Sequence, residues 1–337
     1  MEHQTPFNPL EDPGKLLFDF IQFVRTNSLE ECNLHGIMVT AAMDHLVEEF
    51  YHKEPEKYNL VFEAVSHAAQ QPGISIIHVC FLKELLRQKQ YALGTSTLRW
   101  DIITSNLPTP SLLEYCLLAA YHCLGNNDLY EAQGWMFSIL YLPTAVVTVF
   151  HEKALFGFLL LHLGLNGKRY PINSTTCGNL LPLKTFIAPY ESYIDAYQKG
   201  IEPLQAVLKE NWLRYETDNA IPFILFSLEQ FPRHQLYKLR RRFRSLPINY
   251  VSDKLSLSEE QTWEIVKKYD EKSKLVQNEE GQYFVEFDPF EPVNMEQCKE
   301  LSEKLVESAK ILESVKEMKS MYFSKSPYKK SMTQIKA

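Results

Sequence analysis

Apolar residues recur every three or four positions along much of the chain, a period that predicts amphipathic helices. Between about Lys15 and about Leu165 the periodic segments are short, and turn-forming residues separate them. The clearest breaks are Pro72-Gly73, 106–110, 125–128 and Pro143. Because short helices joined by tight turns are typical of stacked helical hairpins, we expect a helical-repeat region over 14–145, after an extended lead-in over 1–13.

One pair of these segments loosely follows the tetratricopeptide pattern. Ala120 is a small residue near the end of the first segment, Ala132 would let two helices cross closely, and Pro143 would close the repeat. The turn between the segments departs from the consensus by about two residues. An ordinary helical hairpin explains the pattern about equally well, so we describe the region as tetratricopeptide-like.

In the second half of the chain the pattern predicts more helices, followed by shorter elements. After a polar loop over 168–183, helices are expected at 189–199, 202–211, 217–230 and 233–245, the last one ended by Pro247. Tyr250, Val251 and Leu255 suit a short helix. Ser258 and Gln261 match a capping box, in which each side chain satisfies a backbone donor. The helix that follows has a predicted buried face of Trp263, Val266 and Tyr269.

A two-stranded hairpin is expected next. Leu275 and Val276 begin an extended run, and 278–282 is polar and contains Gly281, as a turn requires. Alternation over the second strand places Tyr283, Val285 and Phe287 on one face. Helices followed by such a hairpin are typical of a winged helix, here predicted over 233–288. The alternative is a helical hairpin with a frayed end.

A further amphipathic helix is predicted over 294–319. Asn294 and Gln297 suit a capping box, and a near-heptad stripe follows. The stripe consists of Cys298, Leu301, Leu305, Leu312 and Val315. A long helix at a chain end often has nowhere in its own domain to bury its stripe, so we expect it to pack on other chains rather than fold back. Residues 320–337 are lysine- and serine-rich and are expected to be disordered.

Composition narrows the function classes. Hydrophobic residues make up 45% of the 337 residues and charged residues 23%, which excludes global disorder. The net charge of −7 argues against nucleic acid as the main ligand. A basic cluster of Arg240, Arg241, Arg242 and Arg244 is the exception. The capped helix, which would have to enter a DNA groove, carries Glu259, Glu260 and Glu264, so we expect the cluster to pair with acidic neighbours in this chain or in a partner.

The sequence offers no local motif for catalysis. The six cysteines are scattered, as expected for free, mostly buried thiols in a reducing compartment. His151-Glu152 lacks the second histidine of a zinc motif, and His122 is expected to be a packing or surface residue. No phosphate-binding loop or nucleophile elbow occurs. We therefore expect no enzyme, metal site or cofactor, and an intracellular, soluble chain with no signal peptide and no membrane span.

Residues 144–287 resemble the PCI family, above all in the leucine-rich segment up to Leu165, in 186–219 and in 246–287. The resemblance implies a mainly α fold: a helical-repeat solenoid, a PCI domain over 146–290 with the winged helix, and a long C-terminal helix. One departure is that 271–273 replace the usual glycine after the capped helix, which puts the geometry of that turn in doubt.

The PCI family supplies scaffold subunits to the proteasome regulatory lid, the COP-9 signalosome and translation initiation factor three. The similarity is strongest to the signalosome, which removes a ubiquitin-like modifier from cullins through a separate metalloprotease subunit. The resemblance therefore implies a non-catalytic scaffold in cytoplasm and nucleus, whose partners are other PCI and metalloprotease-like subunits and, indirectly, cullin ubiquitin ligases. Another PCI assembly, above all the proteasome lid, and a nucleic-acid-binding PCI protein are the alternatives.

The resemblance also implies where subunits meet. PCI subunits join edge to edge through their winged-helix sheets, so strand 283–287 with Tyr283, Val285 and Phe287 is expected to offer backbone groups to a neighbour. Terminal helices gather in one bundle, which would bury Leu301, Leu305, Leu312 and Val315.

Overall fold

The structure is a computed structural model that describes residues 12–99, 106–142, 144, 146–171 and 183–288. The lead-in over 1–11, the terminal helix with Leu301, Leu305, Leu312 and Val315, and the tail over 320–337 lie outside the described residues. So does most of the predicted loop over 168–183.

The described residues are mainly helical, as the sequence predicts. The helices are α1 (Pro13–Thr26), α2 (Leu29–Leu34), α3 (Gly36–Phe50), α4 (Pro55–Ala68), α5 (Ile76–Arg87), α6 (Tyr91–Ser96), α7 (Thr109–Gly125), α8 (Leu129–Tyr141), α9 (Val149–Asn166), α10 (Lys184–Lys199), α11 (Ile201–Thr217), α12 (Ile221–Arg240), α13 (Ile248–Leu255) and α14 (Glu259–Tyr269). The strands are β1 (Ser245–Pro247), β2 (Lys274–Gln277) and β3 (Tyr283–Glu286).

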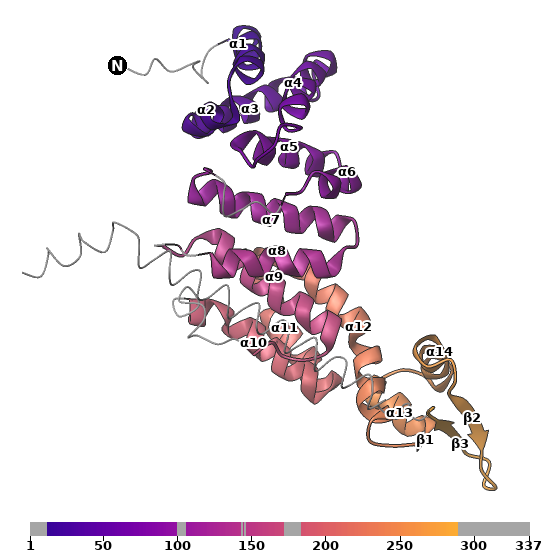
Figure 1. Ribbon diagram of the computed structural model, residues 1–337. Helices are drawn as coiled ribbons and strands as arrows, with labels where there is room; N and C mark the ends of the chain where they lie inside the picture. Colours follow the sequence, from indigo (N-terminus) through magenta and orange to yellow (C-terminus); the bar gives the residue numbers. More distant parts are fainter. Residues whose placement is uncertain (1–11, 100–105, 143, 145, 172–182, 289–337) are drawn as a thin grey trace, which may run out of the picture.

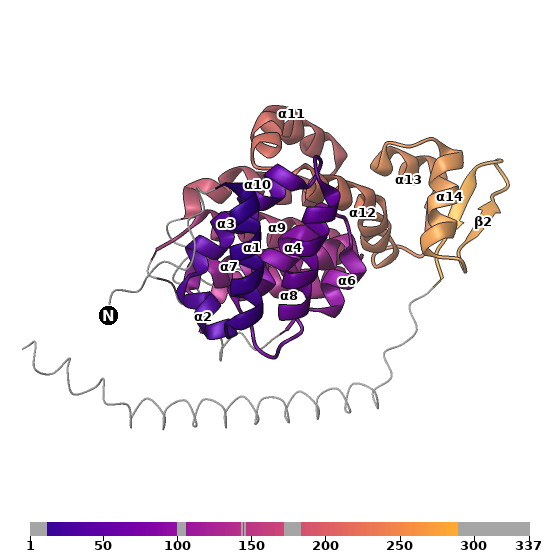
Figure 2. The same ribbon diagram turned by 90° about the horizontal axis from the view of Figure 1, so that it is seen from above.

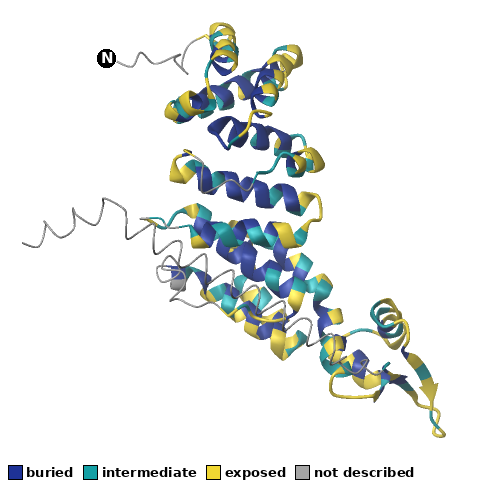
Figure 3. Ribbon diagram, in the orientation of Figure 1, coloured by how far each residue is buried: buried dark blue, intermediate teal, exposed yellow. Residues whose placement is uncertain are grey.

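Helices α1 to α9 form a stack (Figure 1). Helix α8 packs against α7 and α9, whereas α1 packs mainly against α4 and α3, and α2 mainly against α5. The view from above shows α10, α11 and α12 beside the later helices of the stack (Figure 2). One apolar core runs from Leu16 on α1 to Phe231 on α12. Burial is heaviest in the middle of the stack, while helix ends and turns are exposed (Figure 3). We call α1–α12 up to Phe231 the helical stack.

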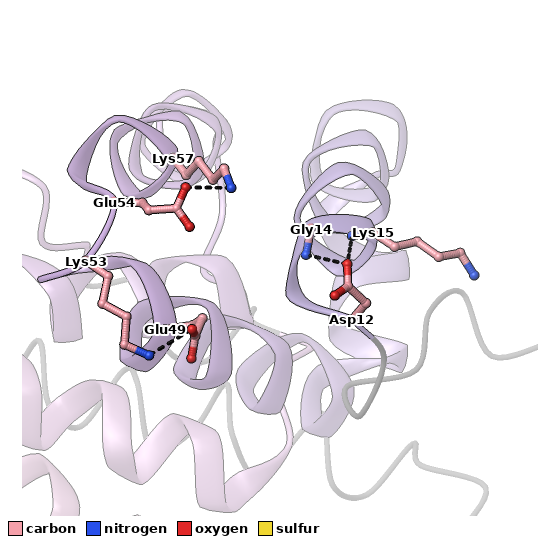
Figure 4. Close-up of polar contacts among 7 residues, drawn as sticks. All are labelled: Asp12, Gly14, Lys15, Glu49, Lys53, Glu54 and Lys57. Atoms are coloured by element: carbon pink, nitrogen blue, oxygen red, sulfur yellow. Dashed lines mark hydrogen bonds and ion pairs between the residues drawn. The ribbon is translucent and has the colours of Figure 1, made fainter.

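Local contacts fix the ends of the first helices (Figure 4). The Asp12 carboxylate accepts hydrogen bonds from the backbone N–H of Gly14 and of Lys15, at 3.1 and 3.3 Å, so it caps α1. Surface ion pairs Glu49–Lys53 and Glu54–Lys57, at 2.8 and 2.6 Å, lie at the turn between α3 and α4. Pairs of this kind are exposed and contribute little to stability, so packing holds these helices in place.

The tetratricopeptide-like pair forms an antiparallel hairpin of α7 and α8, joined by a turn in which Asn127 has a positive φ of 64°. Ala120 and Ala132 are fully buried. The ring of Trp135 lies edge-on to that of Tyr115, with centroids 5.9 Å apart. Small residues thus let the two helices approach while large rings fill the spaces on either side.

Helix α9 is buried on almost all sides between α8, α10 and α12. A Cβ atom on Gly164 would lie 2.4 Å from the Phe226 ring of α12, so glycine is needed for this close crossing. Tyr193 and Tyr197 of α10 are also buried, and their hydroxyl groups hydrogen bond to the hydroxyl and the backbone carbonyl of Ser227, respectively. These two buried hydroxyl groups therefore find their partners within the stack.

Helix α12 corrects the predicted boundaries. The sequence places helices at 217–230 and 233–245, but α12 is continuous from Ile221 to Arg240 and contains Pro232. Proline removes one backbone hydrogen bond, yet packing of α12 along α9 keeps the helix intact. The end of the predicted helix 233–245 is instead extended, because Ser245–Pro247 form strand β1.

A second, smaller core follows α12. Its eight buried members are Leu236, Leu246, Ile248, Val251, Leu255, Val266, Val285 and Phe287. They come from the end of α12, from α13 and α14, and from a three-stranded antiparallel sheet. The order along the chain is helix, strand, two helices, two strands, and the winged helix over 233–288 stays a prediction. We call residues 233–288 the module; Figure 1 shows it projecting from the end of the helical stack.

Candidate subunit interface

The sheet of the module has the strand order β1-β3-β2. Strand β3 pairs with β1 through Leu246 opposite Val285, and with β2 through Leu275 opposite Val285. It is therefore the central strand, and both of its edges are occupied. The prediction that strand 283–287 offers its backbone to a neighbour is wrong for this reason, because β1, which the sequence analysis missed, takes up the second edge.

The open edge of the sheet belongs to β2. The backbone N–H of Asn278 donates to the carbonyl of Gln282 at 2.9 Å, so these two residues form a hydrogen-bonded pair of the β2–β3 ladder. Because such pairs alternate along an antiparallel ladder, the backbone groups of Leu275 and Gln277 point away from β3. Among the described residues no strand covers them. Strand β1 is the poorer edge, since it is short and ends in Pro247, which has no N–H.

The two faces of the sheet differ in burial. The predicted alternation is correct: Val285 and Phe287 face the core and are fully or almost fully buried. They hold the module together, so they have little surface to give to a partner. Tyr283 lies on the same face but near the hairpin turn, where its side chain is 46% exposed.

The outer face of the sheet carries an apolar row. The register places Pro247, Phe284 and Val276 side by side across the three strands. Val276 is exposed, and Pro247 and Phe284 are half-buried. Beside this row Lys274 lies opposite Glu286. An apolar row with charged neighbours, next to an open strand edge, is suited to contact with another protein.

Local hydrogen bonds set the geometry of the module. Ser258 and Gln261 form the predicted capping box at the start of α14. After α14, Ser273 donates its hydroxyl to the Asp270 carboxylate at 2.6 Å and its backbone N–H to the Asp270 carbonyl at 3.1 Å. This turn needs no residue with positive φ, which explains how 271–273 can replace a glycine. At the hairpin, Gly281 has the positive φ, 83°, that the turn requires.

The basic cluster divides in two. The Arg240 guanidinium donates from Nε to the backbone carbonyl of Asp288 at 3.0 Å, and the same nitrogen lies 3.4 Å from the Asp270 carboxylate. Arg240 thus ties α12 to the end of α14 and to Asp288, two residues after β3. The predicted pairing with acidic neighbours in the chain is correct for Arg240. Arg241, Arg242 and Arg244 are exposed.

A cavity of about 360 Å³ lies where the module meets the helical stack. Leu165, Asn166 and Lys168, at and after the end of α9, line one side. Residues of α12 and of the module line the rest: Arg233, His234, Leu236, Tyr237, Arg240, Val266, Tyr269, Asp270 and Phe287. Sequence reasoning missed this cavity because its walls come from segments that are far apart along the chain.

The histidines singled out by the sequence are structural. His122 is buried and its Nε2 lies 2.8 Å from the carbonyl oxygen of Leu82. His151 packs against Thr148 in a capping box at the start of α9. Burial lowers the pKa of both imidazoles, so both are neutral at pH 7. Cys32, Cys80, Cys116 and Cys123 are free and buried, as predicted. Within the described residues, no three His, Cys, Asp or Glu side chains are placed to hold a metal ion.

No helix in the described part of the chain is long and apolar enough to cross a membrane. No protein-family model matches the chain. The chain is 44% identical over 333 residues to COP9 signalosome complex subunit 3 of Schizosaccharomyces pombe, and the alignment covers 98% of each of the two chains. The similarity therefore includes both the helical stack and the module.

Proposed function

The chain belongs to the family of COP9 signalosome subunit 3, and from this premise we propose that it is a non-catalytic scaffold subunit of a COP9 signalosome. The carrying observation is the similarity to the Schizosaccharomyces pombe subunit along 98% of both chains. A likeness of this extent favours the signalosome over the proteasome lid, the alternative that the PCI resemblance leaves open.

In this proposal the chain joins other PCI and metalloprotease-like subunits, and one of those carries out the removal of the ubiquitin-like modifier from cullins. The protein would act in the cytoplasm and nucleus, without a cofactor of its own. Its architecture supports a scaffold role, because the stack has one large apolar core of its own while the module presents an open strand edge and an apolar row.

We place the subunit contact at the edge strand β2, in the backbone groups of Leu275 and Gln277, together with Val276 and Tyr283. Val285 and Phe287 support this surface from the core. The stripe of Leu301, Leu305, Leu312 and Val315 remains a prediction for a shared helical bundle, outside the described residues.

Affinity purification of the tagged full chain, followed by mass spectrometry, tests the proposal. We expect the other signalosome subunits in near-equal amounts. Recovery of proteasome-lid subunits in their place would contradict the signalosome assignment. Truncation after Pro292 should leave a folded protein that no longer recovers the complex; if the truncated chain recovers the full set, the role of the terminal helix is wrong.

A further inference from the structure

The second half of α12 and the turn after it carry an excess of positive charge, and among the described residues only Arg240 of this group is paired with carboxylates. No Asp or Glu occurs between Glu229 and Asp253, whereas six Lys or Arg do: Arg233, Lys238, Arg240, Arg241, Arg242 and Arg244. Arg240 is engaged with Asp270 and Asp288. Among the described residues no carboxylate lies within 4.0 Å of the charged nitrogens of Arg233, Arg241, Arg242 or Arg244, the distance at which such pairs are recognised.

The positive charges in this region lower the pKa values of neighbouring basic groups. Burial is the main reason that the pKa of His234 falls to about 4, and the charges of Arg233 and Lys238 lower it further. The pKa of Lys238 is also lowered, first by burial and then by Arg242. Like charges gathered at the end of α12 repel one another, and anions from a partner would relieve that repulsion.

The cavity beside α12 extends this cationic surface. Lys168 and Arg233 are exposed cations on its rim, contributed by the two sides of the joint. Leu165, Leu236, Val266 and Phe287 supply apolar lining. Arg240 is paired with Asp270 in the cavity wall, whereas Lys168 and Arg233 are exposed cations of the lining. A site of this kind suits a ligand that is both anionic and partly apolar.

We propose that the cavity and the cations around it, Lys168, Arg233, Arg241, Arg242 and Arg244, form a docking surface for an acidic segment of a partner protein. An apolar side chain of the segment enters the cavity, and carboxylates on either side of it meet Lys168 and Arg233. The remaining arginines attract the segment and favour rapid association. This surface lies apart from the β2 edge, so it goes beyond the scaffold contact and does not depend on it.

Two observations favour an acidic protein over nucleic acid. The exposed side of α14, the helix that would enter a DNA groove, carries Glu259, Glu260 and Glu264, which would repel phosphates. The apolar lining of the cavity would also remain unused by a phosphate backbone, whereas a leucine or phenylalanine between glutamates would fill it.

Fluorescence anisotropy with the purified full chain tests the proposal. The probe is a fluorescein-labelled peptide of glutamates interrupted by leucine and phenylalanine. Two further peptides replace the glutamates by glutamine or the apolar residues by serine, and a labelled single-stranded RNA and a DNA duplex serve as the nucleic-acid probes. The test variant is Lys168→Glu with Arg233→Glu. Its matched control is Lys254→Glu with Lys267→Glu, the same change of charge at exposed positions of the module outside the cavity lining.

We expect the acidic peptide to bind, the test variant to weaken its binding by at least about tenfold, and the control variant to change it by less than about twofold. The glutamine and serine peptides should each bind several-fold more weakly. Three results would overturn the proposal: no binding at low ionic strength, equal losses in test and control variants, or tighter binding of RNA or DNA than of the peptide. If peptide binding persists while the tagged chain fails to recover signalosome subunits, the scaffold function is contradicted and the docking surface is not.

Discussion

The helical stack and the module are both held together by buried apolar residues, but their cores differ greatly in size. The stack shares one core from Leu16 to Phe231, so truncation of one side chain is felt by several helices. The module has eight buried apolar residues and three short strands. Its open strand edge, its exposed Val276 and its exposed arginines would be liabilities in an isolated protein. The comparison teaches that the large core supplies stability, and that the small one holds surfaces for partners in place.

The two regions meet through α12 and a close contact at the end of α9. Gly167 has a positive φ of 65°, and a Cβ atom there would lie 2.6 Å from the His234 ring. His234 also hydrogen bonds through Nδ1 to the Tyr197 hydroxyl at 2.8 Å. The position of the module therefore follows from the packing of α9, α10 and α12 in the stack.

The largest effect is expected in the stack. Trp135 is fully buried between α7 and α8, whereas Trp212 on α11 is 44% exposed. Trp135→Ala should lower the free energy of unfolding by about 4 kcal/mol, because it leaves a cavity that the packed helices cannot fill. Trp212→Ala, the control, should lower it by less than about 1 kcal/mol. Urea unfolding followed by circular dichroism measures both, and similar losses would show that the stack is not one tightly packed core.

A pair of valines makes the same comparison within the module. Val285 is buried at the centre of the sheet, and Val276 on the neighbouring strand is 41% exposed. We expect Val285→Ala to destabilise the module by about 2 kcal/mol and Val276→Ala by less than about 0.5 kcal/mol. Hydrogen exchange locates the effect. Faster exchange in α13, α14 and the sheet with unchanged protection in α7 and α8 would support two separate cores, and uniform acceleration would contradict them.

A fall in pH should lower the folding stability of both regions, because each contains a buried histidine with a lowered pKa. Burial is the main cause that lowers the pKa of His78 in the stack and of His234 at the joint from 6.5 to about 4. The unfolded chain takes up these protons near pH 6.5 and the folded chain only near pH 4. The stability that depends on neutral imidazole is therefore complete above about pH 6.5 and falls as the pH drops toward 4.

At about pH 5 each of these two histidines should account for about 2 kcal/mol of lost stability relative to neutral pH. His78→Gln and His234→Gln should each remove that share of the pH dependence in urea unfolding measured at both pH values. His67→Gln, at an exposed position of α4, is the control for the loss of an imidazole. A wild-type chain whose stability is equal at the two pH values would contradict this account.

A smaller effect separates the two kinds of arginine at the end of α12. Arg240→Gln removes the hydrogen bond to the Asp288 carbonyl and the ion pair with Asp270 at a half-buried site, and it should cost about 1.5 kcal/mol. Arg241→Gln is exposed and should change stability by less than about 0.5 kcal/mol. Differential scanning calorimetry at low and high salt measures both. Equal effects of the two substitutions would mean that Arg240 does not tie α12 to the module.

Local signals predicted the module well, and long-range pairing limited the rest. The capping box of Ser258 and the alternation over Tyr283–Phe287 depend on neighbouring residues, and both expectations are correct. Strand β1 is too short for alternation to reveal, and its partner β3 follows two helices later. Because β1 was not predicted, β3 was expected to be an edge strand, although it is the central strand of the sheet. At Pro232 the sequence predicted a break between two helices that does not exist. Contacts of α12 with α9 override the local tendency of proline to end a helix.

The residues of the proposed docking surface illustrate the same limit. The basic cluster is visible in the sequence, but only the fold shows that Arg240 turns toward Asp270 while Arg241, Arg242 and Arg244 stay exposed. Lys168 and Arg233 line the same cavity, although α10, α11 and half of α12 separate them along the chain. A run of charged residues can be recognised in the sequence. Which of them pair within the chain and which remain exposed for a partner is seen only in the fold.

The central claim is that the edge strand β2 joins this chain to a neighbouring subunit, and Gln277→Pro in the tagged full chain tests it most directly. The Gln277 N–H points away from β3, so proline there should remove an outward donor and leave the hairpin paired. The control is Lys254→Ala, an exposed change in the same module, and circular dichroism should show unchanged folding for both. We predict that quantitative mass spectrometry of affinity-purified Gln277→Pro recovers the other signalosome subunits at least about tenfold less efficiently than the wild type. Undiminished recovery by the folded variant would contradict the claim.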